Sequence, residues 1–196
     1  MTDYFRNKYR INSHRLKGWD YRTPGWYFVT ICTFDGIPFL GEIQNNIMGL
    51  SDIGCMVWKH WYQIPKHQPH VNLGVFIVMP NHVHLTIELT NQIDNETHVE
   101  TLHATSLQKP QEFNNSDKFM SDISPNSGSL SVLIRSFKSS VTRWCNNNEH
   151  GNFAWQPGFY DHIIRNQTSL ENIHFYIQNN PINWLKDRYH PDKCKK

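Results

Sequence analysis

Two histidines stand one residue apart inside an apolar run of the sequence. They are His82 and His84, in the stretch FIVMPNHVHLTIEL at residues 76–89. In a β-strand, residues i and i+2 point to the same face and lie about 6.6 Å apart, at a rise of ~3.3 Å per residue. Two imidazoles placed in this way can converge on one cation, so we interpret them as part of a metal site that needs at least one more ligand. The alternative is a pair of ordinary polar strand residues that face the solvent.

The surrounding sequence predicts the strands and helices that would position this pair. β-Branched and aromatic runs bounded by proline, glycine and asparagine predict strands over 25–34, 71–80, 82–90 and 159–166. The middle two are joined at Pro80 and Asn81, which indicates a tight hairpin. Apolar residues at helical spacing predict helices over 50–67, 129–148 and 169–181. The expected N-caps are Ser51 or Asp52 and Thr168 or Ser169, and the expected limits are Pro65 and Pro181.

The order of these elements predicts the fold class. Strand, helix, strand, strand, helix, strand is the ferredoxin-like βαββαβ pattern, an α+β fold whose antiparallel sheet carries helices on one face. One further helix follows at the C-terminal end. Residues 91–128 are rich in Asn, Gln, Ser, Thr, Glu and Pro, and we interpret them as a long flexible insertion. We therefore expect a basic arm over 1–22, a single domain over 23–185 and a basic tail over 186–196.

Composition narrows the functional class only partly. The net charge of +2 does not by itself indicate a nucleic-acid-binding protein, but 12 histidines, 7 tryptophans, 8 tyrosines and 11 phenylalanines favour metal binding and stacking on bases. The four cysteines form no CxxC pair, which argues against a zinc knuckle or a disulfide framework and fits a reducing cytosol. No apolar run approaches the ~18 residues of a membrane span. We therefore expect a cytoplasmic protein without a membrane partner.

Two motifs together resemble a known family. The run MPNHVHL resembles the HUH motif (histidine, hydrophobic residue, histidine) of single-strand DNA endonucleases and transposases. The C-terminal run WQPGFYDHIIRNQTSLENIHFYIQNNPINW is similar to the signature of one branch, the REP-associated tyrosine transposases. The resemblance covers roughly residues 25–185. It implies a metal-dependent endonuclease and strand transferase that acts on single-stranded DNA with hairpins (repeat palindromes) through a 5′-phosphotyrosine intermediate, with Mg²⁺ or Mn²⁺ as cofactor.

The resemblance also implies which tyrosine is the nucleophile. The family places it on the helix after the last strand, in a Y-x-x-x-N-P setting, which is Tyr176 here; Tyr160 lies on the preceding strand. On a helix, Tyr176 and Asn180 would share a face, so Asn180 is the expected third metal ligand. Gln178 and Asn179 are alternative ligands, and Asn180 could instead cap the helix. Without the resemblance, Tyr176 would be interpreted as a core aromatic.

Basic residues are the candidate DNA contacts, and two other functions compete with the first. We expect Arg135, Lys138, Arg143 and Arg165 to contact phosphates, against the alternative that they form a solvated surface. A domesticated enzyme of the same family that processes repeats would keep the same catalytic residues. A non-catalytic ferredoxin-like nucleic-acid-binding module would have no use for the histidine pair or for Tyr176. The resemblance also allows a homodimer, since related single-strand transposases include dimers that share active sites.

Overall fold

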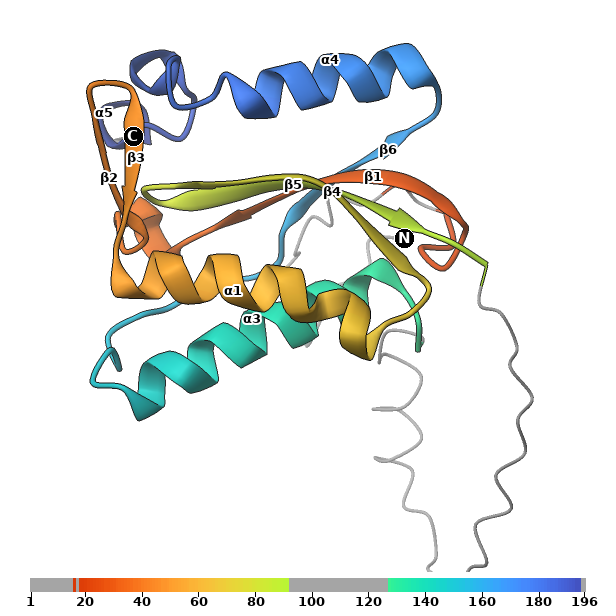
Figure 1. Cartoon of the computed structure of the whole chain (residues 1–196), viewed down its shortest axis with the longest axis horizontal. Coiled ribbons are helices and arrows are strands. Elements are labelled where there is room, and N and C mark those ends of the chain that lie inside the picture. The colour runs from red at the N-terminus through yellow and green to blue at the C-terminus, as the bar shows by residue number, and fades with distance from the viewer. Residues whose placement is uncertain (1–15, 17, 92–126, 195–196) are drawn as a thin grey trace, which may run out of the picture.

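The computed structural model describes residues 16, 18–91 and 127–194. Residues 92–126 of the predicted insertion over 91–128, and most of the predicted N-terminal arm, lie outside these residues. The described residues form a sheet with helices on both faces (Figure 1).

Four antiparallel strands form the main sheet. They are β1 (Gly25–Cys32), β4 (Val71–Met79), β5 (His82–Leu89) and β6 (Tyr160–Ile164), in the order β4-β5-β1-β6. This is the order of the predicted ferredoxin-like fold, with β5 and β1 in the centre and β6 at an edge. The register places Thr30 of β1 opposite His84 of β5, and Thr30 also lies opposite Tyr160 of β6. The two histidines therefore lie on a central strand.

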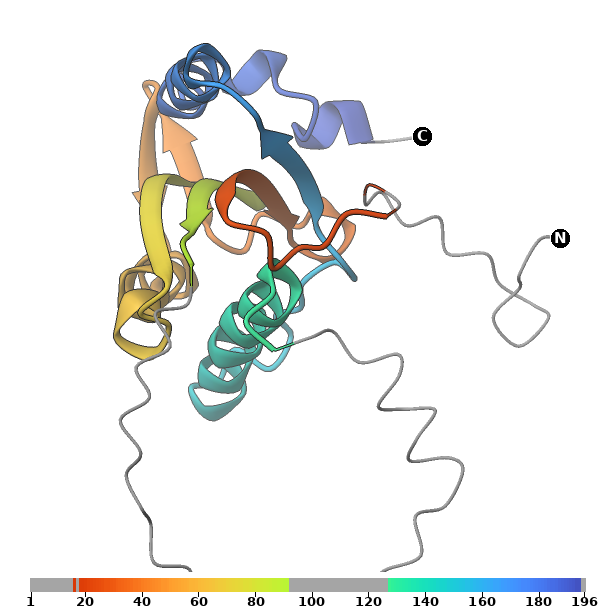
Figure 2. The ribbon, with the colours of Figure 1, turned by 90° about the vertical axis from the view of Figure 1, so that its right-hand side faces the viewer.

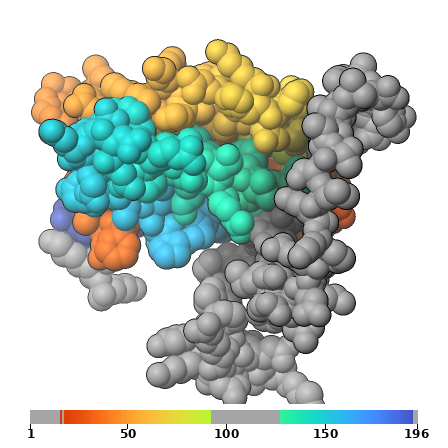
Figure 3. Space-filling model, turned by 90° about the horizontal axis from the view of Figure 1, so that it is seen from below, coloured from red at the N-terminus to blue at the C-terminus, as the bar shows by residue number. Residues whose placement is uncertain are grey.

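The helices divide between the two faces of the sheet. The first face is covered by α1 (Asp52–His67) and α3 (Leu130–Asn147), which lie side by side in Figure 3. The other face is crossed by α4 (Gln167–Gln178), which packs over β4 and β5 (Figure 2). Both predicted features, two helices on one face and an added C-terminal helix, are confirmed. None of the helices among the described residues is long and apolar enough to cross a membrane.

The hydrophobic core lies between the sheet and the pair α1 and α3. Val83, Leu85 and Ile87 alternate along β5 with polar residues, and all three are completely buried in this core. Trp61 of α1 stacks on Phe76 of β4, with ring centroids 5.0 Å apart. Each such buried side chain stabilises the fold by about 1.5–3 kcal/mol relative to an exposed one. The period-two pattern of β5 therefore directs its apolar side chains to one face and its histidines to the other.

The ends of two helices differ from the prediction. Ser51 caps α1 as expected, since its Oγ accepts a hydrogen bond from the Gly54 N–H at 3.1 Å. Pro65, however, lies inside the last turn of α1, where its missing N–H removes one hydrogen bond without stopping the helix. The N-cap of α4 is Asn166, whose Oδ1 accepts from the Ser169 N–H at 2.8 Å, rather than Thr168 or Ser169. This helix ends at Gln178, so it does not extend to residue 181.

Several short elements were not predicted. A two-stranded hairpin, β2 (Gly41–Gln44) and β3 (Ile47–Leu50), turns at Asn45 and Asn46, both of which have positive φ. Such a pair of left-handed residues is typical of a type I′ turn. The other three elements are η1 (Phe34–Gly36), η2 (Trp184–Lys186) and α5 (Pro191–Cys194). The segment around η2 and α5 brings the C-terminal part of the chain back to the start of β5 (Figure 1).

Candidate metal and nucleophile site

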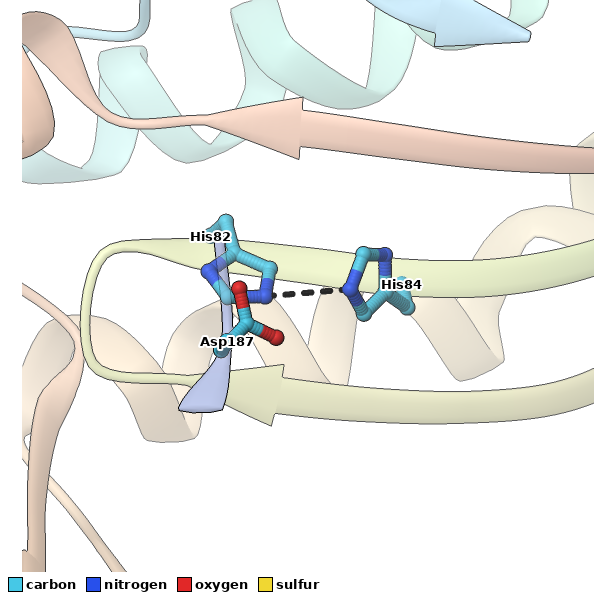
Figure 4. A group of neighbouring side chains, drawn as sticks. All are labelled: His82, His84 and Asp187. Atoms are coloured by element: carbon cyan, nitrogen blue, oxygen red, sulfur yellow. Dashed lines mark hydrogen bonds between the residues drawn. The ribbon is translucent and has the colours of Figure 1, made fainter. Parts of the chain in front are cut away.

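The two histidine rings converge on the α4 face of the sheet, as the spacing predicts. Their Nε2 atoms are 3.1 Å apart, and both side chains are buried. If both Nδ1 atoms carry the proton, both Nε2 atoms present lone pairs toward the same point. Two such lone pairs would suit a shared cation. With the proton of His84 on Nε2 instead, the same contact is a hydrogen bond from His84 to His82, as drawn in Figure 4. In either tautomer the two rings contact each other, so they are not two independent strand residues that face the solvent.

Asn81 fixes the tautomer of His82. The Asn81 Nδ2 donates to the carbonyl oxygens of Gly36 and Tyr189, at 3.1 and 2.7 Å, which identifies Oδ1 as the acceptor of the side chain. This Oδ1 lies 2.9 Å from Nδ1 of His82. His82 must therefore carry its proton on Nδ1, and its Nε2 is free to bind a metal. Such an outer hydrogen bond orients a ligand ring and raises its basicity.

His84 also has a polar neighbour at Nδ1, but this neighbour is a hydroxyl, which can donate or accept. The Thr30 hydroxyl lies 2.9 Å from Nδ1 of His84, directly across the register between β1 and β5. Burial, with the positive charge of Arg188, lowers the pKa of His84 to about 3. Burial also lowers the pKa of His82 well below its usual value, and the charges of His84 and Arg188 act in the same direction. Both rings are therefore neutral near pH 7, which is the form that binds a metal.

A carboxylate that the sequence analysis missed completes the cluster. Asp187, just after η2, places a carboxylate oxygen within 4.8 Å of the ligand atoms of His82 and His84. Figure 4 shows the three side chains turned toward one another. Little in the sequence indicated this residue, because a single aspartate in a tail interpreted as basic does not indicate a site. Only the return of the chain after α4 brings it to the histidines.

Tyr176 lies at the edge of this cluster. Its phenol oxygen is 3.2 Å from Nε2 of His84, and the two ring centroids are 5.3 Å apart. The side chain is 45% exposed, which excludes the alternative of a core aromatic. Partial burial, and then the charge of Asp187, raise the pKa of Tyr176, while a hydrogen bond from Asn180 and the charge of Arg188 oppose the rise. The phenol is therefore protonated near pH 7, beside the imidazoles and open to solvent.

Asn180 lies beside Tyr176 for a different reason from the one expected. It is not on the helix, because α4 ends at Gln178, but its N–H bonds the Ile177 carbonyl in the turn that follows. The side chain is 2% exposed, and its Oδ1 has no hydrogen-bond partner among the described residues. A buried amide oxygen without a donor is costly, which fits a position that completes its coordination with a bound group. Its role as a metal ligand stays a prediction.

Arg188 adds a positive charge that the sequence analysis did not identify. Its guanidinium lies 4.5 Å from the ring centroid of Tyr189 and 5.3 Å from that of Tyr160. It also donates a hydrogen bond to the Tyr189 hydroxyl. The ring of Tyr189 lies 4.7 Å from that of His82, so the guanidinium is held near the histidine pair. An arginine at this place suits a phosphate group better than a bare cation.

The predicted DNA contacts lie apart from the cluster. Arg135, Lys138 and Arg143 are on α3, which covers the face of the sheet opposite to the histidines. Lys138 donates to the carbonyl oxygens of Gln156 and Gly158, and burial lowers its pKa to about 8. Arg165 is exposed between β6 and α4. This arrangement does not test whether the four residues contact DNA, so their role as phosphate contacts stays a prediction.

The donor set fits a divalent cation. Two neutral imidazole nitrogens and one carboxylate converge within a few ångströms, and a buried amide oxygen lies beside them. This mixture of nitrogen and oxygen donors accepts several divalent ions and does not select one of them. Three or four protein ligands would also leave positions open for a substrate oxygen.

The chain was compared with known proteins. No family model matches it. An uncharacterized protein of Haemophilus influenzae is 35% identical over 191 residues, which is 97% of this chain and 99% of that protein. Among solved structures, a REP-associated tyrosine transposase bound to a REP hairpin superposes with a TM-score of 0.54 and 17% identity, over 89% of this chain and 74% of that one. The fold implied by the two sequence motifs is therefore confirmed.

Proposed function

We propose that the chain, which belongs to the same family as the Haemophilus influenzae protein and has the fold of a REP-associated tyrosine transposase, is a metal-dependent endonuclease and strand transferase for single-stranded DNA. Its expected substrate carries a hairpin, as in the structure of the similar transposase. The observation that carries the proposal is the position of the Tyr176 phenol, 3.2 Å from His84 Nε2 at the edge of the cluster with His82 and Asp187.

The proposed reaction uses the Tyr176 oxygen as nucleophile. A bond forms between this oxygen and the scissile phosphorus, and the bond from phosphorus to the 3′ oxygen breaks. The phenol proton passes to solvent as the new bond forms, and the departing 3′ oxygen takes a proton from solvent to give a free 3′-hydroxyl. The products are a 5′-phosphotyrosine and a 3′ end, so attack by a 3′-hydroxyl on the phosphotyrosine reverses the step and joins strands.

The residues around Tyr176 prepare this step. A divalent cation, when bound, would polarise the scissile phosphate and offset its developing charge. His82 and His84 remain neutral and are held in orientation by Asn81 and Thr30. The guanidinium of Arg188 is placed to contact a phosphate oxygen near the nucleophile. Partial burial raises the pKa of the Tyr176 phenol, which is protonated near pH 7, so its proton must leave during the attack.

One structural observation disfavours the non-catalytic alternative. A ferredoxin-like module that binds nucleic acid stacks bases on aromatic residues of an open sheet face. Here α4 lies across that face, and the residues beneath it are His82, His84 and Thr86, which are buried. The domesticated enzyme would have the same site, so it differs only in genomic context. Many identical copies with flanking ends favour a mobile element, and a single copy beside scattered palindromes favours domestication.

The proposal is tested by covalent capture. The full chain is incubated with end-labelled single-stranded hairpin DNA and Mn²⁺, and a denaturing gel is examined for labelled protein. Wild type and the control Tyr62→Phe, an exposed tyrosine on α1, should form an adduct, while Tyr176→Phe should form none. EDTA should abolish the adduct. Cleavage by Tyr176→Phe without an adduct would show that an activated water is the nucleophile, and an adduct in this variant would show that another residue is; either result would overturn the proposal.

A further inference from the structure

A second open pocket lies beside the candidate site, between the edge strand β6 and the first half of α4. We call it the β6–α4 pocket. Its volume is about 500 Å³, which is in the ~300–1,000 Å³ range of small-ligand sites. It is lined by Phe28, Tyr160, His162, Asn166, Thr168, Ser169, Asn172 and Ile173.

The lining of the pocket is aromatic and polar. Among the described residues that line it, two are phenyl or phenol rings, and none is an aspartate, glutamate, lysine or arginine. The Oδ1 of Asn166 is occupied by the cap of α4, which leaves its Nδ2 as a donor. Amide, hydroxyl and imidazole groups at the rim can pair with the edge of a flat heterocycle, while the rings can stack on its face.

Phe28 forms a wall between this pocket and the candidate site. Its ring centroid lies 5.4 Å from that of His84 and 6.3 Å from that of Tyr176, on the side of the nucleophile. It lies 6.4 Å from the ring of Tyr160, on the side of the pocket, in an edge-to-face arrangement. The pocket is thus separated from the reacting atoms by one aromatic ring. A group bound in the pocket would be separated from the scissile phosphate by only a short stretch of DNA backbone.

A positive charge that could contact the connecting phosphate lies at the rim of the β6–α4 pocket. The guanidinium of Arg188 lies over the ring of Tyr160, 5.3 Å from its centroid, and its charge also acts on His84 and Tyr176. The phenol of Tyr160 is 38% exposed. One side of the ring is therefore taken by the arginine, and the remaining exposed part opens toward the pocket. The guanidinium of Arg188 therefore lies near both the pocket and the buried histidine pair.

We infer that the β6–α4 pocket binds the base of an unpaired nucleotide next to the scissile phosphate. The base stacks on Tyr160 and Phe28, its edge contacts Asn166 and Asn172, and Arg188 contacts the connecting phosphate. This inference rests on the proposed function, because that function makes single-stranded DNA the ligand. It adds a binding site for one flanking base, which helps to place the scissile bond at Tyr176.

The test measures binding without cleavage. A hairpin oligonucleotide with a fluorescent label and a single-stranded flank is titrated in EDTA with the full chain, and each flank position is made abasic in turn. The variants are Tyr160→Ala, Tyr160→Phe and Asn172→Ala, with Tyr62→Ala as the control at an exposed tyrosine of α1. Thermal melts confirm that each variant folds. A parallel assay in Mn²⁺ records adduct formation.

The expected result is coupling between one base and Tyr160. Tyr160→Ala should weaken binding about 5- to 150-fold, which is the loss of one base–aromatic stack, and Tyr160→Phe should bind like wild type. One abasic position should weaken wild type by a similar factor and should not weaken Tyr160→Ala further. Asn172→Ala should cause a smaller loss at the same position.

Other results separate the pocket from the chemistry. If Tyr160→Ala binds DNA and forms the adduct like wild type, the role of the pocket is overturned and the proposed function stands. The same conclusion follows if the loss of DNA affinity in Tyr160→Ala is multiplied by the loss at every abasic position. If the coupling is present but wild type forms no adduct, the pocket stands and the proposed chemistry fails. If wild type binds no single-stranded DNA at all, both are overturned.

Discussion

Successive residues of β5 point to opposite faces of the sheet, and the two faces differ in composition. Val83, Leu85 and Ile87 face α1 and α3 and are completely buried among apolar side chains. His82 and His84 face α4 and are equally buried, but each of their ring nitrogens has a polar neighbour. One strand therefore supplies the hydrophobic core from one face and the candidate ligands from the other. Stability and chemistry can be changed separately at positions only one residue apart.

The largest effect is expected on the histidine face. His84→Ala removes one ligand and the closest neighbour of the Tyr176 hydroxyl, so it should abolish Mn²⁺-dependent cleavage. Binding of single-stranded DNA should change little, because affinity comes mainly from phosphate contacts by basic residues. Gel assays for cleavage and binding, with calorimetry for Mn²⁺, check this. Equal loss of cleavage and DNA binding would indicate a folding defect or a pure binding module.

The neighbouring position on the core face should give the opposite result. Leu85→Ala leaves a cavity beneath α1 and α3 and should lower the free energy of unfolding by about 2–5 kcal/mol. Its folded molecules should still bind Mn²⁺ and cleave DNA, since no ligand is touched. Denaturant unfolding gives the first quantity, and cleavage per folded molecule at low temperature gives the second. A Leu85→Ala protein that is folded but inactive would show that the faces are not independent.

A smaller effect is expected from the residue that orients His82. Asn81→Ala removes the acceptor of the His82 Nδ1 proton and should weaken Mn²⁺ binding about 10- to 100-fold. Asn81→Asp keeps an acceptor oxygen and should lose less. The control is Asn72→Ala, an exposed strand position whose amide donates a hydrogen bond to Glu88. Calorimetric titration with Mn²⁺ measures all three; equal affinities for Asn81→Ala and wild type would contradict the role given to Asn81.

The last effect concerns pH. The native pKa of His84 is about 3, while in the unfolded chain it is near 6.5, so between these values the unfolded chain binds a proton that the native chain does not. Without metal, stability should therefore fall as the pH falls below about 6.5, by up to ~1.4 kcal/mol per pH unit for each buried histidine. Urea unfolding at pH 7 and pH 5 measures the slope, and His84→Gln should reduce it. An identical slope in His84→Gln would contradict the neutral, buried state.

The two faces also explain how much the sequence could predict. The alternation in HVHLTIEL is a local pattern, and it predicted both the strand and the convergence of the histidines, which are confirmed. The ferredoxin-like order followed from similar local patterns. The β2–β3 hairpin escaped prediction because its strands have four residues each and its Asn45–Asn46 turn lacks the glycine that usually marks such turns.

The remainder of the site depends on contacts between distant parts of the chain. Asp187 and Arg188 reach the histidines only because the segment after α4 returns to the start of β5. No spacing rule links residues about a hundred positions apart, so both were left in a tail interpreted as basic. Asn180 was predicted to lie beside Tyr176 by helical spacing, and it does so in a turn instead. The motif therefore predicted correctly that Asn180 lies beside Tyr176, but a turn and not a helix brings the two residues together.

The most direct measurement identifies the residue that is linked to DNA. Trypsin cuts after arginine and lysine, so the adduct should release peptide 166–186, whose only tyrosine is Tyr176, while Tyr160 lies in peptide 144–165. The wild-type adduct formed in Mn²⁺ is digested with trypsin and nuclease, and the peptides are examined by mass spectrometry. The expected result is a nucleotide attached through phosphate to peptide 166–186. A nucleotide on peptide 144–165, or on any other tyrosine, would contradict the assignment of Tyr176 as the nucleophile.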